Sequence, residues 1–196
     1  MALKLYVFGS VDEPKPEPRN DENDKVELKA LEKRAIVVIW TIVGILVGFT
    51  GLVLELLAFA NCQYHPNILA LCVCVSIVGS STAAFISCLQ RVSNGWELAD
   101  GQQIPKSNGK ERFNNKIAHF LLFRPFLGIL IGFIFYFASF ANLPLFGFAF
   151  DCKQLFNCTS LHQLLFMSLI GGFFAKTLLD KLKDIFESLV FGNKKG

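Results

Sequence analysis

Four long stretches with almost no charge dominate this 196-residue sequence and limit the folds that it can adopt. They cover about 35–59, 67–89, 125–146 and 161–179. A helix needs about 20 apolar residues to cross a hydrocarbon layer about 30 Å thick. Because unpaired backbone groups are costly in lipid, such stretches are expected to be helical. We therefore predict an all-α membrane protein with four transmembrane helices.

The charged residues lie between these stretches and divide the chain into five segments. We expect a charged N-terminal tail (1–34), a first transmembrane hairpin (35–89) and a cytoplasmic loop (90–124) with an interfacial segment at 113–123. A second hairpin (125–179) and an amphipathic C-terminal tail (180–196) follow. The first apolar stretch follows 34 mostly polar residues, so we do not expect a cleavable signal peptide.

Lysine and arginine are distributed very unevenly among the connections. Seven lie in 1–34, six in 91–124 and five in 176–195, whereas Lys153 alone lies in the other two connections. The positive-inside rule then predicts a multi-pass protein of the inner cell membrane with both termini in the cytoplasm. The net charge of +3 is too small and too dispersed to indicate a nucleic-acid partner.

One apolar phrase occurs twice, as GILVGF from residue 44 and GILIGF from residue 128. AFAN at 58–61 and SFAN at 139–142 repeat a second phrase, at a slightly different offset. Two spans per half would make this a parallel repeat of helical hairpins. Chance similarity is the alternative, because glycine is frequent in membrane helices.

On a helix, Gly44, Gly48, Gly51 and Glu55 fall within an arc of about 60°. Small residues let helix backbones approach closely in lipid, so this groove is expected to pack against a helix of the same chain or of another copy. Glu55 is the intramembrane polar candidate. It is expected either to be buried beside a hydroxyl or water, or to handle a proton or cation.

Small residues in the other stretches also predict helix packing: Ser76, Ser80, Gly128, Gly132, Gly171 and Gly172. The alternative for the two serines is a polar pore lining. Arg124 precedes Pro125 at the expected start of the third span, where it is predicted to anchor in cytoplasmic headgroups.

Cys152 and Cys158 lie on the predicted outer side. They are expected to form a disulfide or to stay free thiols, and a Cys62–Cys152 pair is a further alternative. No metal-ligand spacing, catalytic motif or phosphate loop is present in the sequence, so we expect no cofactor and no enzymatic activity.

These features favour an oligomeric, membrane-anchored sensor, scaffold or pore-type component with a cytosolic protein partner. The amphipathic C-terminal segment fits either the membrane surface or packing against other copies. In size and layout, the chain resembles the small four-span accessory proteins of bacterial antiviral systems, such as the membrane component of Kiwa-type defence. The alternative is a small ion or proton-coupled channel or transporter that uses Glu55. Small multidrug-type carriers have a similar architecture, but their acid lies deep in the first helix.

Overall fold

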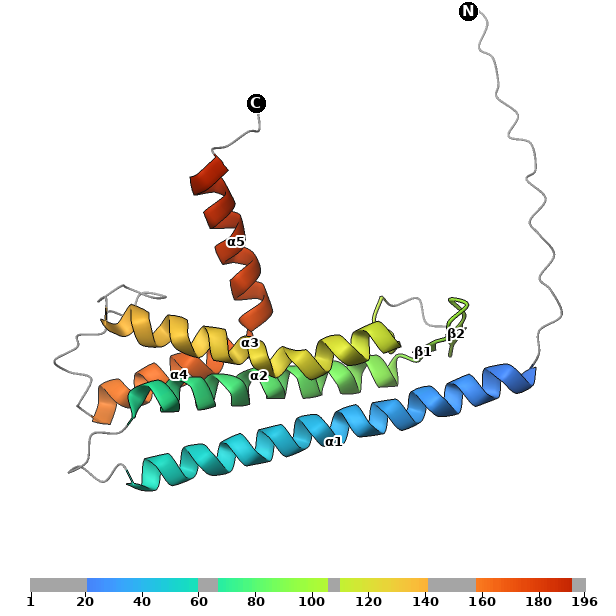
Figure 1. Ribbon diagram of the computed structural model, residues 1–196, viewed down its shortest axis with the longest axis horizontal. Helices are drawn as coiled ribbons and strands as arrows, with labels where there is room; N and C mark the ends of the chain where they lie inside the picture. Colours follow the sequence, from blue (N-terminus) through green and yellow to red (C-terminus); the bar gives the residue numbers. More distant parts are fainter. Residues whose placement is uncertain (1–20, 60–66, 106–109, 141–157, 192–196) are drawn as a thin grey trace, which may run out of the picture.

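The computed structural model describes residues 21–59, 67–105, 110–140 and 158–191, and this part is mostly helical (Figure 1). In chain order the elements are α1 (Asp21–Phe59), α2 (Ile68–Ser93), β1 (Trp96–Glu97), β2 (Gln103–Ile104), α3 (Asn115–Phe140), α4 (Cys158–Phe173) and α5 (Ala175–Phe191). Helices α1 to α4 form a bundle, and α5 projects away from it (Figure 1).

Among the described residues, α1, α2 and α3 are long and apolar enough to cross a membrane. α4 and α5 form a bent pair that would add a fourth span if the pair crosses as one unit. The structure therefore confirms a helical chain with three to four apolar helices that could span a bilayer.

The fourth apolar stretch differs from its prediction, because 161–179 is not one continuous helix. α4 ends at Phe173, and α5 begins at Ala175 with its axis turned by 83°. Lys176, Asp180 and Lys181 follow the turn. A helix with charges on successive turns and apolar residues between them is more stable at a membrane surface than in hydrocarbon. This amphipathic pattern accounts for the change of direction.

Helix α2 is the centre of the bundle. Its apolar window is 67% buried inside the protein, against 33% for α3 and 11% for α1. One apolar cluster joins α2 to α3 and α4, and includes Leu71, Cys72, Ile131, Phe135 and Leu164. A second cluster joins α1, α2 and α3, and includes Ala35, Ile42, Ala84, Phe113 and Leu121. Since α1 is the least buried of the three, most of its apolar surface faces outward.

Glycines bring the backbones of α3 and α4 against α2. A Cβ on Gly132 would lie 2.6 Å from Val73 Cα, and one on Gly128 would lie 2.6 Å from the Ser76 carbonyl oxygen. A Cβ on Gly172 of α4 would meet the same Ser76 backbone. No side chain fits at these distances, so glycine is required for the helices to pack this closely.

The described part of the connection between α2 and α3 is more ordered than its turn-rich sequence suggested. β1 and β2 pair antiparallel, with Trp96 opposite Ile104. Gly95 has φ of +110°, and a Cβ there would lie 2.7 Å from the Ile104 carbonyl oxygen, so the turn needs glycine. The Trp96 ring packs edge-on against Phe113, with centroids 5.3 Å apart. This contact holds the hairpin to the chain that enters α3.

The third apolar helix starts earlier than expected. We predicted an interfacial segment at 113–123 and a span from Pro125, but α3 begins at Asn115 and contains this proline. Asn114 caps the helix, because its Oδ1 accepts a hydrogen bond from Ile117 N at 2.9 Å. Proline inside a helix removes one backbone donor, a loss that membrane helices tolerate. The interfacial segment and the span are therefore one helix.

Gly132→Leu and Gly172→Leu are expected to destabilise the bundle, because the new side chains would meet the α2 backbone. Overpacking of this kind costs about 1–3 kcal/mol or prevents folding. Thermal unfolding of the purified protein in detergent measures the loss. Phe166→Leu is the control, since this side chain of α4 is 60% exposed. An equal loss in all three variants would contradict the packing role.

Candidate functional site

The first copy of the repeated phrase lies on a face of α1 that is free in the described structure. Gly44, Gly48 and Gly51 are exposed, and nothing described comes within 4 Å of a Cβ built on any of them. Val47 and Leu54 on the same side are 62% and 63% exposed. Packing of this groove against another described helix of the same chain, one of our two alternatives, is therefore wrong. We call this surface, centred on the three glycines, the α1 glycine face.

Glu55 lies at the end of the α1 glycine face, one turn beyond Gly51. Its side chain is exposed, and it forms no hydrogen bond or ion pair with any described residue. The alternative in which Glu55 is buried inside the bundle beside a hydroxyl is therefore wrong for the single chain. A carboxylate on the outer surface of an apolar helix is costly in a bilayer. Glu55 thus lies on a surface of α1 that no described residue covers.

The two serines predicted on α2 face the interior of the bundle. Ser76 Oγ donates to the Ser168 carbonyl oxygen of α4 at 3.0 Å, and Ser80 Oγ donates to the Arg124 carbonyl oxygen of α3 at 2.6 Å. Both side chains are fully buried. These hydroxyls tie α2 to its two neighbours and do not line a polar path in the described bundle.

The structure separates the predicted packing residues into two groups. One group lies at the contacts among α2, α3 and α4 and comprises Ser76, Ser80, Gly128, Gly132, Gly171 and Gly172. Within it, Gly171 faces the ring of Phe135, whereas Gly128, Gly132 and Gly172 face backbone. The other group is the α1 glycine face, which stands apart from this core. The two copies of the phrase therefore have different surroundings.

Arg124 turns toward α2, although we predicted that it would extend to the headgroups. Its Nη1 donates to the Ala83 carbonyl oxygen at 3.2 Å and to Ser87 Oγ at 2.7 Å, and its Nε is buried without a hydrogen-bond partner. No described carboxylate pairs with it, and the nearby Arg91 adds repulsion. The Cα of Arg124 lies about 14 Å along α3 from Asn115. An arginine within an apolar helix that could span a membrane is rare and usually has a function.

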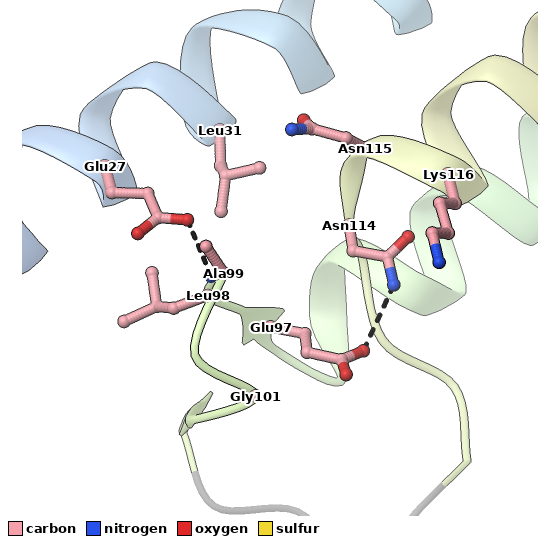
Figure 2. Close-up of a pocket in the computed structure, with 9 residues that line it drawn as sticks. All are labelled: Glu27, Leu31, Glu97, Leu98, Ala99, Gly101, Asn114, Asn115 and Lys116. Carbon is pink, nitrogen blue, oxygen red and sulfur yellow. Dashed lines mark hydrogen bonds between the residues drawn. The ribbon is translucent and has the colours of Figure 1, made fainter.

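A polar pocket of about 250 Å³ lies at the end of the bundle where α1 and α3 begin (Figure 2). Glu27 Oε1 accepts from the Ala99 backbone N–H at 2.7 Å, and Asn114 Nδ2 donates to Glu97 Oε2 at 3.2 Å. Sequence reasoning missed this pocket. Asn114 before an apolar run is a recognisable cap, but no local signal pairs Glu27 with a residue 72 positions away.

The predicted disulfide stays a prediction. Cys152 lies outside the described residues, and only the backbone of Cys158, at the start of α4, is described. Cys72, Cys74 and Cys88 are free thiols buried along α2. In the described ranges, no group of three or more His, Cys, Asp or Glu side chains could hold a metal ion.

Comparison with known protein families, curated proteins and solved structures finds no match to this chain.

Arg124→Met is expected to leave the stability of the bundle unchanged or to raise it. The substitution keeps much of the side-chain volume and removes a partly buried charge that lacks a carboxylate partner, a change that is often neutral or stabilising. Ser87→Ala should instead lower stability by about 1–3 kcal/mol, because the charged guanidinium then loses an acceptor. Unfolding temperatures in detergent compare the two variants. A larger loss in Arg124→Met than in Ser87→Ala would show that the arginine mainly stabilises the fold.

Proposed function

We propose that this chain is a multi-pass protein of the inner cell membrane that works as a homo-oligomer and anchors a cytosolic protein partner at the bilayer. The observation that carries this proposal is the α1 glycine face, which ends at Glu55 and has no partner among the described residues. In this assembly the protein acts as a sensor, a scaffold or a component of a pore.

A second copy of α1 is the occupant that fits this face best. Helix association in lipid depends on close packing, which exposed glycines permit. The chain already uses glycine in this way at Gly128, Gly132 and Gly172. Two copies related by a twofold axis would bring the same glycines together from both sides. The contact would also enclose Glu55 and reduce its exposure to hydrocarbon.

Four spans with cytoplasmic termini agree best with the distribution of charge. The bent α4–α5 pair supplies the fourth crossing, in which α5 turns at its inner end. Eighteen of the nineteen Lys and Arg residues then lie at or inside the cytoplasmic surface, and only Lys153 lies outside. Under this topology, the pocket of Figure 2 faces the cytosol and offers Glu27, Glu97 and Lys116 to a partner.

Labelling of single cysteines tests the topology. In a variant without native cysteines, Lys153→Cys is expected to react with a membrane-impermeant maleimide on intact cells. Lys110→Cys, an exposed position between β2 and α3, should react only after the membrane is permeabilised. The opposite pattern would overturn the proposed orientation.

The alternative is an ion or proton-coupled channel or transporter that uses Glu55, and it has weaker support. Ser76 and Ser80 of α2 are engaged in helix contacts, and Glu55 lies near the end of α1 on its outer face. Participation in bacterial antiviral defence stays a prediction from size and layout. Duplication of the hairpin also stays a prediction, because the surroundings of the two phrases do not test their common origin.

Gly48→Leu is expected to dissociate the oligomer while the monomer stays folded. The leucine would separate two α1 backbones but meets nothing within a single described chain. Light scattering in detergent measures the mass of the particle, and circular dichroism measures the fold. Gly48→Ala is the matched smaller step and should retain most of the oligomer.

An unchanged mass for Gly48→Leu would contradict the α1 interface. If the protein conducts protons in liposomes and Glu55→Gln abolishes this flux, the channel alternative replaces the scaffold function.

A further inference from the structure

A groove of about 610 Å³ lies between α1 and the first turns of α3. It adjoins the pocket of Figure 2 at Asn115 and shares no residue with the α1 glycine face. The residues along it change from charged to apolar, and include Lys33, Arg34, Val37, Val38, His119 and Leu122. The groove is thus amphipathic along its length.

The charged end of the groove carries cations without a carboxylate partner. These cations are Lys33 and Arg34, and both are exposed. His119, which lines the same groove, is exposed too. Arg34 Nη1 donates to Asn115 Oδ1, a neutral amide, and no described acid forms an ion pair with Lys33 or Arg34. Glu27, an acid of the neighbouring pocket, accepts instead from a backbone N–H. This end of the groove therefore offers an anion two positive charges that no described carboxylate neutralises.

The apolar end begins about one helical turn further along both helices. α1 and α3 run in the same direction in the bundle, so Val37 on α1 and Leu122 on α3 lie on the same side of the cations (Figure 1). One turn advances about 5.4 Å along a helix. Beyond them, Trp40 and Phe123 are 70% and 62% exposed, as expected for side chains that face lipid.

We propose that this groove binds one anionic phospholipid. The phosphate would lie against Lys33, Arg34 and His119, because arginine and lysine form strong charge-assisted hydrogen bonds to phosphate oxygens. An acyl chain would follow Val37 and Leu122 into the bilayer. Basic pockets between membrane helices at a cytoplasmic surface suit such headgroups.

A phospholipid suits the groove better than a soluble anion or an acidic peptide. A free phosphate would use only the cations and would leave the apolar walls uncovered. The groove also lies at the border between the charged residues of α1 and the exposed apolar side chains. Headgroups of the lipid bilayer occupy that depth.

The test is native mass spectrometry of the full-length protein in detergent, titrated with phosphatidylglycerol or with phosphatidylcholine. One phosphatidylglycerol is expected to stay bound per chain, with little retention of phosphatidylcholine. Lys33→Gln combined with Arg34→Gln should weaken phosphatidylglycerol binding by about tenfold or more. The matched control is Lys25→Gln with Lys29→Gln, which removes the same charge from exposed positions of α1 outside the groove and should bind normally.

A second variant tests the apolar walls. Val37→Trp fills the apolar end of the groove without changing its charge, and it should also weaken phosphatidylglycerol binding. Inorganic phosphate and the water-soluble headgroup glycerophosphoglycerol should not compete. Equal losses in the control pair, or full competition by the soluble anions, would overturn the lipid site. Binding that survives both the charge variant and Val37→Trp would overturn it too.

Discussion

Close contact between the backbone of α2 and the glycines of α3 and α4 is the interaction on which the rest of this structure depends. Inside a bilayer the hydrophobic effect does not drive helices together, because lipid tails are as apolar as the helix surfaces. Short-range packing and hydrogen bonds must therefore hold them together. Gly132 and Gly172 allow the approach, and the hydroxyls of Ser76 and Ser80 bond across the two contacts. α2 thus contacts a helix on each side, and its Ser76 and Ser80 hydroxyls are hydrogen-bonded inside the bundle.

The position of α1 follows from this arrangement. It packs on α2 through a narrow face that includes Ala35 and Ile42, and its remaining surface is exposed. Two uncovered features therefore lie on α1 at different positions along the helix. The α1 glycine face with Glu55 suits a second protein helix, whereas the groove at Lys33 and Arg34 suits an anionic lipid. One peripheral helix would thus connect the bundle both to another copy and to the surrounding membrane.

Arg124 shows why depth and direction are difficult to predict from local sequence. An arginine before a proline is typical of a helix start at the membrane surface, but the helix starts at Asn115, where Asn114 provides the cap. The side chain then meets Ser87 of α2 and turns inward. The single helix predicted over 161–179 also differs from the structure, in which the axis turns after Phe173. The error at Arg124 came from treating α3 without its neighbour α2.

The sequence by itself determined the apolar helices, because hydrophobic length and the absence of charge decide which segments can enter lipid. It also determined that small residues would mediate helix contacts, since glycine is recognisable on a helical wheel. Only the tertiary structure decided which of two nearly identical phrases would be buried. Gly128 and Gly132 meet α2, and Gly44 and Gly48 meet no described residue. The reason is physical: a glycine stripe permits close contact with a neighbouring helix, and in the bundle the stripe of α3 lies against α2 whereas that of α1 faces outward.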